Sequence, residues 1–256
     1  MPDEILTEIV DGVATVTLNR PEKRNAMSSA LLRGLRTSFD ELDADARVRV
    51  VVVRGAGRAF CSGMDLREMG ERRGAADPES GVTEILQRVE RSRHPTIAMV
   101  HGDAIAGGCE LALHCDLRIA AEPARLGMPL VRIGLLVPFP LLQKLVEIIG
   151  SAGTRELLFI GKPVTALRAL EMGMVHQVVP AAEIESTTMA LARTIAGHAP
   201  LSLTGIKAGL LRAVSLRDQV DHRDIDELAR QAHQSADAAE GRQAMLEKRP
   251  PVFRGK

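Results

Sequence analysis

Apolar and polar residues alternate along the start of the chain and then change to a helical spacing. Residues 5–10 and 13–19 alternate on either side of Asp11-Gly12, a dipeptide that favours a tight hairpin turn. Between residues 28 and 43, apolar side chains recur every third or fourth position, and Ser28 or Ser29 stands where a helix N-cap is expected. The pattern predicts an antiparallel hairpin followed by a capped helix.

Continuous apolar runs follow and are separated by helical patterns. Such runs are typical of strands that are covered on both faces of a sheet, and the interruptions between them match helix-forming spacing. Strands are predicted at residues 50–53, 96–100, 117–120 and 175–179, and helices at 82–89, after Gly108, and at 140–149, 154–160 and 166–172.

The character of the chain changes near Gly197. From residue 184 onward the spacing is helical, and no further strand is predicted before the basic tail. We therefore expect an α/β core of residues 1–196, followed by a helical C-terminal region of residues 197–256.

A glycine pair marks the first candidate for chemistry. Gly107 and Gly108 follow the apolar run 96–100 and precede a helical pattern that carries Glu110. Glycine lets a ligand approach the backbone, and amides at a helix N-terminus have no intrahelical acceptor. Such amides can bind a developing oxyanion, with Glu110 as an acid or base. The alternative is a tight turn with a solvated glutamate in the first helical turn.

A second stretch strengthens the chemical interpretation. Residues 60–66 (FCSGMDL) follow another buried run, and together with residues 101–116 they resemble the paired signature of the enoyl-CoA hydratase/isomerase, or crotonase, family. In that family two backbone amides hold the carbonyl oxygen of an acyl-CoA thioester. The resemblance implies that these amides are the N–H groups of Met64 and Gly107, with Glu110 as the catalytic carboxylate.

Further matches occur in the family's order along the whole chain. Residues 19–27 (NRPEKRNAM) resemble the stretch that borders the CoA adenine, and shorter matches lie at 126–129, 171–175 and 247–249. The resemblance implies a crotonase-like α/β spiral of ββα units with a helical C-terminal oligomerisation region, although no sequence repeat indicates a spiral. CoA is then part of the substrate, and no separate cofactor is expected. The substrate-binding or CoA-binding positions that the resemblance implies are Lys23, Arg24, Ala26, Asp65, Leu66, Leu130, Met245 and Lys248.

Leu130 is the main departure from the family pattern. Hydratases of this family carry a second glutamate at this position, and no Asp or Glu occurs from Pro123 to Lys144. Water addition to a double bond needs water activation at one carbon and proton delivery at the other, which two carboxylates serve well. The two alternatives for Arg132 are a contact to a substrate carboxylate and an exposed arginine, and the second is the simpler expectation.

Three functions follow from this mixture of matches. The first is an enoyl-CoA hydratase-type lyase of fatty acid or related acyl-CoA metabolism. The second is a one-carboxylate reaction of the same family: decarboxylation, double-bond isomerisation or retro-aldol cleavage. Isomerases, however, usually keep the acid at the position of Leu130. The third is an acyl-CoA binding protein without catalysis, against which the retention of Glu110 beside both glycines argues.

Composition restricts the partners of the 256-residue chain. Lysine plus arginine and aspartate plus glutamate both number 33, which argues against a nucleic-acid binder. Cys61, Cys109 and Cys115 have no metal-ligand spacing, so we expect reduced, buried thiols and no metal. The acidic N-terminus and the absence of a membrane-length apolar run predict a cytoplasmic protein without a membrane partner.

The C-terminal region and one internal segment carry the remaining expectations. Leu203, Ile206 and Leu210 form an apolar stripe with no sheet of their own to cover. The resemblance implies a homo-oligomer, a trimer or a dimer of trimers, in which Met245 and Lys248 reach the adenine and phosphates of CoA on a neighbouring subunit. The charged stretch between Asp65 and Val82 is interpreted as a flap over the pocket or an exposed loop, and its position favours the flap.

Overall fold

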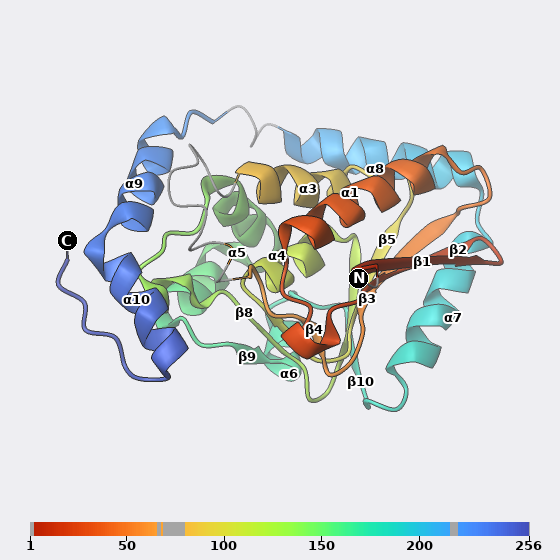
Figure 1. The fold of residues 1–256 in the computed structure, drawn as a ribbon. Coiled ribbons are helices and arrows are strands. Elements are labelled where there is room, and N and C mark those ends of the chain that lie inside the picture. The colour runs from red at the N-terminus through yellow and green to blue at the C-terminus, as the bar shows by residue number, and fades with distance from the viewer. Residues whose placement is uncertain (1–2, 66–67, 69–79, 216–219, 256) are drawn as a thin grey trace.

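A computed structural model describes residues 3–65, 68, 80–215 and 220–255 of the chain (Figure 1). Its larger sheet has six strands in the order β1-β2-β3-β5-β7-β10. The β1–β2 pair is antiparallel, which confirms the predicted hairpin, and the other pairs are parallel. The strands are β1 (Ile5–Val10), β2 (Val13–Leu18), β3 (Val50–Gly55), β5 (Thr96–Val100), β7 (Leu117–Ala121) and β10 (Gln177–Val179).

A second sheet of short strands lies beside the first. It has the order β4-β6-β8-β9, with β4, β6 and β8 parallel. Each of these three strands directly follows a strand of the larger sheet, and a helix comes next, so the chain repeats a ββα unit. The sequence pattern did not predict these strands, because two or three residues are too few to display a period. They are β4 (Ala59–Cys61), β6 (Asp103–Ile105), β8 (Arg125–Gly127) and β9 (Val164–Thr165).

Helices cover both faces of the larger sheet. Along β3, Val51 and Val53 face one hydrophobic cluster while Val50 and Val52 face the other, as alternating side chains require. The first cluster lies under α1 (Ser29–Ala44), α3 (Ser80–Glu90) and α4 (Gly107–His114), and α7 (Ile184–Ala196) covers the second (Figure 1). The prediction that residues 50–53 form a strand buried on both faces is confirmed.

The N-cap expected at Ser28 or Ser29 is Ser28. The hydroxyl of Ser28 accepts a hydrogen bond from the Leu31 N–H, and Thr165 caps α6 (Ala166–Glu171) in the same way. The two helices expected on either side of Gly150 form one element, α5 (Phe139–Ile160), with a break in helical geometry at that glycine. The remaining short helices are η1 (Pro21–Lys23) and η2 (Pro129–Ile133).

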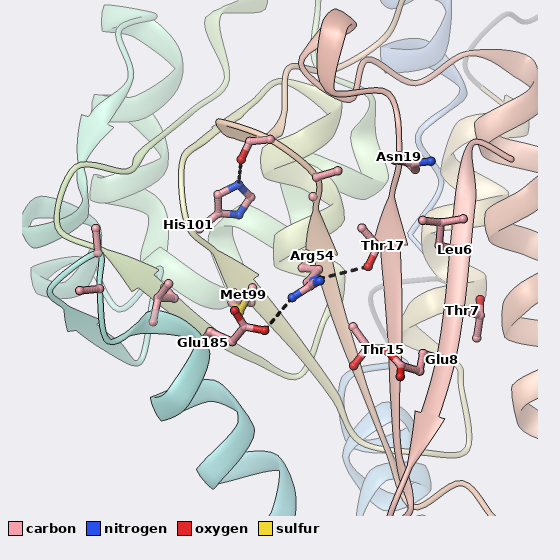
Figure 2. Close-up of a pocket in the computed structure, with 16 residues that line it drawn as sticks. Leu6, Thr7, Glu8, Thr15, Thr17, Asn19, Arg54, Met99, His101 and Glu185 are labelled. Atoms are coloured by element: carbon pink, nitrogen blue, oxygen red, sulfur yellow. Dashed lines mark hydrogen bonds and ion pairs between the residues drawn. The ribbon is translucent and has the colours of Figure 1, made fainter. Parts of the chain in front are cut away.

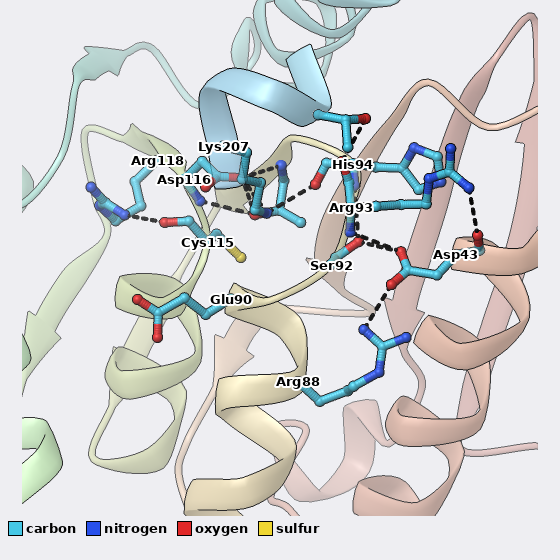
Figure 3. Close-up of polar contacts among 12 residues, drawn as sticks. Asp43, Arg88, Glu90, Ser92, Arg93, His94, Cys115, Asp116, Arg118 and Lys207 are labelled. Carbon is cyan, nitrogen blue, oxygen red and sulfur yellow. Dashed lines mark hydrogen bonds and ion pairs between the residues drawn. The ribbon is translucent and has the colours of Figure 1, made fainter. Parts of the chain in front are cut away.

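The C-terminal region contains α8 (Pro200–Val214), α9 (Arg223–Gln234) and α10 (Ala236–Glu247). In α8, which is described throughout, Lys207 is the one buried side chain. Its ammonium donates to Asp116 Oδ2 at 2.7 Å and to the His94 carbonyl at 2.9 Å, as Figure 3 shows. The same Asp116 oxygen accepts from the N–H and the hydroxyl of Thr96. An ion pair therefore connects α8 to the core.

Of the helices in the described residues, none combines the length and the apolar character that crossing a membrane requires.

Candidate active site

The second sheet brings the predicted site residues together. Met64 lies just beyond the end of β4, Gly107 just beyond β6, and Leu130 just beyond β8. Because β4, β6 and β8 are parallel neighbours, their carboxyl ends lie at one edge of the sheet. Segments that are far apart in the sequence thus meet at the strand ends, where open parallel sheets usually bind ligands.

The backbone amides of Met64 and Gly107 lie close to each other. A Cβ atom added to Gly107 would be 3.7 Å from Met64 N and 3.4 Å from Met27 Sδ. A Cβ added to the neighbouring Gly63 would be 3.3 Å from Gly107 N. The space beside Gly107 therefore adjoins both amides.

Ala106 adopts an unusual backbone conformation at the start of α4. Its φ of 50° and ψ of −122° lie outside the regions that residues with side chains prefer. Such strain costs about 1–3 kcal/mol and persists only where the surroundings impose it. Here the Ala106 N–H donates to the Gly127 carbonyl on β8, and the strained turn orients the next peptide, which carries the Gly107 N–H.

Gly108 is a glycine for a different reason. An added Cβ would lie 2.2 Å from the carbonyl oxygen of Cys61, well inside contact distance. The absence of a side chain lets α4 pack directly against the backbone of β4. Of the two glycines singled out in the sequence, only Gly107 could carry a Cβ at ordinary contact distances.

Glu110 lies in the first turn of a fully buried helix and is itself 7% exposed. The helix is held at its other end by Arg118, whose guanidinium donates to the carbonyls of Cys115 and Met174 at 2.5 and 2.7 Å. A cation at a helix C-terminus is favourable. Burial lowers the pKa of Arg118 from its usual value. These contacts fix α4, and with it Glu110, relative to the sheet.

The sequence interpretation missed two charged residues next to this helix, Glu90 and Lys144. Glu90 is 6% exposed, and its carboxylate accepts from Lys144 Nζ at 2.8 Å and lies 4.0 Å from His114 Nε2. His114 Nδ1 is 2.8 Å from the carbonyl oxygen of Glu110, so the contact between these two residues involves the Glu110 backbone. In the sequence, Glu90 follows the last apolar residue of a helical pattern, where an exposed side chain is expected. Its burial results from the packing of α3, α4 and α5 against one another.

The loop that contains η1 lies against the Met64 segment. Met27 and Met64 form a parallel bridge, and the Ser62 N–H donates to the Arg24 carbonyl at 3.0 Å. Lys23 and Arg24 are exposed on this loop, and Ala26 is partly buried. The structure thus places all three implied CoA contacts next to the carboxyl end of β4.

Other implied positions are distributed differently. Asp65 is bound to Arg20, and Leu66 lies outside the described residues, as does almost all of the proposed flap. Leu130 is buried in the main core cluster. Met245 and Lys248 are exposed at the carboxyl end of α10, whose Gly241 packs against Ile133 of the same chain. Arg132 is exposed, with its aliphatic stem over Gly161.

The cysteines are buried, as predicted. Burial raises the pKa of Cys61, Cys109 and Cys115 to about 12 in each case. A thiol with such a pKa is protonated near neutral pH, whereas reactive cysteines are accessible and have a lowered pKa. Across the described parts of the chain, His, Cys, Asp and Glu side chains nowhere gather in threes as they would around a metal ion.

An open groove of about 620 Å³ lies elsewhere, along β1, β2 and β3 near the start of α7 (Figure 2). Arg54 crosses it and donates to Thr17 Oγ1 at 3.2 Å and to Glu185 at 2.9 Å. Its lining contains neither Glu110 nor the two amides. The groove is therefore separate from the candidate active site.

Comparisons with known proteins show which family the chain matches. The family model for enoyl-CoA hydratase/isomerase matches residues 8–256. A probable enoyl-CoA hydratase of Bacillus subtilis (strain 168) is 36% identical over 252 residues, which cover 95% of each chain. The 2,3-dehydroadipyl-CoA hydratase of Escherichia coli (strain K12) is 32% identical over 253 residues, which cover 99% of each chain.

Solved structures show the same fold. Methylmalonyl-CoA decarboxylase in complex with 2-nitronate-propionyl-CoA has a TM-score of 0.90 and 29% identity, over 98% of both chains. The expected α/β spiral is therefore confirmed as the crotonase fold. On its sequence match, its fold and the ordered motifs, the chain belongs to the enoyl-CoA hydratase/isomerase family.

Proposed function

We propose that the protein is an acyl-CoA enzyme whose Met64 and Gly107 amides stabilise an enolate-like oxyanion while Glu110 transfers a proton. The supporting observation is that the amides of two distant segments adjoin one space, with the buried Glu110 in the first turn of the helix that Gly107 begins. Fixed donors aimed at developing charge contribute a large share of catalysis in such sites.

The chemistry follows from the positions of these groups. With the thioester oxygen between the two N–H groups, negative charge that develops on this oxygen is stabilised more than the neutral carbonyl is. This lowers the barrier to any step that places charge on the α-carbon. Glu110 then donates or accepts the proton directly or through one water, because it is the carboxylate placed in the first turn of α4.

Among reactions that share this intermediate, we propose hydratase-type lyase chemistry first. The two relatives named above are hydratases or probable hydratases that align over nearly the whole chain. Decarboxylation is the second candidate, favoured by the buried Leu130 where hydratases have an acid and by the fold similarity to methylmalonyl-CoA decarboxylase. Loss of CO₂ creates the enolate without a base, so a single proton donor suffices.

A panel of CoA thioesters distinguishes these reactions. The purified protein would be incubated with enoyl-, β-hydroxyacyl- and malonyl-type CoA esters, and the products identified by mass. Hydration adds one water to the enoyl ester, whereas decarboxylation releases CO₂ from the malonyl-type ester. Turnover of no ester in the panel would contradict the proposed catalytic function and favour an acyl-CoA binding protein.

Leu130→Glu tests whether the missing second carboxylate limits hydration. If water activation is limiting, the variant should hydrate a crotonyl-type thioester at least about tenfold faster than wild type, because a positioned base contributes about 10²–10⁴-fold at best. Leu130→Gln is the matched control, since it adds a similar polar side chain without a base. A buried carboxylate is costly, so thermal unfolding is measured first. A folded Leu130→Glu protein without a gain would assign the limitation to the pocket.

We also propose that the chain forms a closed homo-oligomer. Of the apolar stripe predicted in α8, Ile206 and Leu210 are 60% and 63% exposed, and Leu203 is partly buried. An exposed apolar stripe of this kind marks an interaction surface. The proposed arrangement is a trimer or a dimer of trimers, in which Met245 and Lys248 contact the CoA of a neighbouring subunit.

Lys248→Ala should weaken binding of a CoA ester several-fold, and more at low salt than at high salt, because an exposed ammonium attracts phosphate through a screened interaction. Lys162→Ala, which removes an exposed lysine near the end of α5, is the control. Titration calorimetry at two ionic strengths measures the effect, and light scattering measures the oligomer. A monomer with full activity would contradict both the assembly and the shared site.

A further inference from the structure

Arg20 connects the two segments that meet at the Met64 amide. Its Nη1 donates to the Ala26 carbonyl at 2.5 Å, and Nη1 and Nη2 both lie 3.2 Å from Asp65 Oδ2. Its Nε lies 3.2 Å from a carboxylate oxygen of Glu4. The side chains of Arg20 and Asp65 are only 13% and 15% exposed, so this is a largely desolvated ion pair.

The residues that Arg20 holds are the direct neighbours of a bridged pair. Ala26 precedes Met27, and Asp65 follows Met64. Between them, the Met27 N–H donates to the Gly63 carbonyl at 2.8 Å, and the Asp65 N–H donates to the Met27 carbonyl at 3.1 Å. The Gly63–Met64 peptide, which carries the Met64 N–H, is thus held through its own carbonyl, and the next peptide is held through the Asp65 N–H. The Arg20 guanidinium links the residues on the outer side of both hydrogen bonds, Ala26 and Asp65.

The loop that provides Arg20 is itself rigid. Asn25 is fully buried, and its amide nitrogen donates to the carbonyls of Ala56 and Ala59 at 2.9 and 2.8 Å. Its side-chain oxygen accepts from the Arg20 N–H at 2.9 Å. The backbone of Arg20 is therefore held, through Asn25, against the backbone next to β4. Its guanidinium has a fixed position relative to Asp65 as a result.

We infer that Arg20 is a positioning residue that holds the Met64 N–H in line with the Gly107 N–H, an inference that rests on the proposed function. A buried ion pair gives little net stability, because desolvation of both charges offsets their attraction. It does fix geometry, and donors to an oxyanion must be held within about 0.5 Å of the productive position. Asp65 acts in this arrangement through Arg20, by fixing the peptide that follows Met64.

The test compares a charged and a neutral ligand. 2-Nitronate-propionyl-CoA is anionic and resembles an enolate, whereas propionyl-CoA has a neutral carbonyl, so the ratio of their affinities reports on the oxyanion donors. Titration calorimetry would measure both ligands with wild type, Arg20→Gln and Arg20→Lys. The matched control is Arg125→Gln, because Arg125 forms a comparable two-point contact with Asp103 but is 60% exposed.

We expect Arg20→Gln to lower the preference for the nitronate about tenfold, while propionyl-CoA affinity changes less than about twofold. Arg20→Lys should restore part of the preference, since an ammonium keeps the charge but loses the planar fork. Arg125→Gln should keep the full preference. If Arg20→Gln does not fold, Asp65→Asn, which keeps the shape and removes the charge, should show the same loss.

Three results would overturn the inference, and the third is distinguishable from the other two. The first is a preference for the nitronate that persists in folded Arg20→Gln and in Asp65→Asn. The second is an equal loss of affinity for both ligands in these variants. Either result would show that Arg20 does not position the donor. A wild-type protein with no preference for the nitronate would remove the proposed oxyanion site itself, and the role of Arg20 with it.

Discussion

Glu110→Gln is expected to lower turnover about 10²–10⁴-fold, the contribution typical of a positioned acid or base. Glutamine has the size of glutamate and can still form hydrogen bonds, so the buried first turn of α4 should keep its structure. CoA-ester affinity should remain within a few fold, because the proposed binding groups lie on other elements. The measurement is kcat and KM on the ester that the panel identifies, together with calorimetry of ligand binding.

The control for this variant is Glu171→Gln, which makes the same substitution at an exposed residue that pairs with Arg168 at the end of α6. Its turnover should equal that of wild type. Unchanged turnover in Glu110→Gln would end the assignment of this residue as the proton-transfer group. A parallel loss of binding and turnover would instead indicate that Glu110 acts in substrate binding.

Gly107→Ala and Gly108→Ala are expected to have different effects: the first should lower turnover and keep stability, and the second should lower stability. At Gly107 the added methyl group would make ordinary contacts, with Met27 Sδ at 3.4 Å, so the protein should fold with a midpoint near that of wild type. The methyl group would, however, occupy the space beside Met64 N. Since loss of one oxyanion donor costs about 10²–10³-fold, we expect turnover to fall about 10²-fold or more.

At Gly108 the methyl group would collide with the Cys61 backbone, with its Cβ 2.2 Å from the carbonyl oxygen and 2.7 Å from the carbonyl carbon. Backbone atoms cannot rotate away, so we expect the free energy of unfolding to fall by about 3 kcal/mol. Thermal and denaturant unfolding measure this difference. A stable Gly108→Ala protein, or a fully active Gly107→Ala protein, would contradict the roles assigned to the two glycines.

Local patterns in the sequence specified the local structure well. Asp11-Gly12 between alternating strands gave the hairpin, Ser28 capped α1, and the apolar run at 50–53 became a strand buried on both faces. These predictions succeeded because each depends on neighbours in the chain: a turn conformation, a capping hydroxyl, or a period of alternating side chains. The family motifs likewise lie within short segments.

The second sheet could not be found in this way. Its strands, β4, β6 and β8, contain three residues each, and hydrogen bonds to distant segments stabilise them. Local patterns also fail to predict which charged residues are buried. Glu90 and Lys207 occur in helical patterns that predict exposed side chains, and packing against other elements buries them. A buried charge requires partners, which for Lys207 come from residues 94 and 116, far away in the sequence.

The sequence by itself determined which residues could carry the chemistry: the glycine pair, Glu110, the Met64 segment and the absence of an acid at Leu130. Only the tertiary structure decided how these groups are arranged relative to one another. Parallel pairing of β4, β6 and β8 brings their carboxyl ends to one edge, the strained turn at Ala106 orients one amide, and Arg20 ties the loop behind the other. The physical reason is that the distance between two amides separated by more than forty residues depends on strand register and packing, which no local pattern encodes.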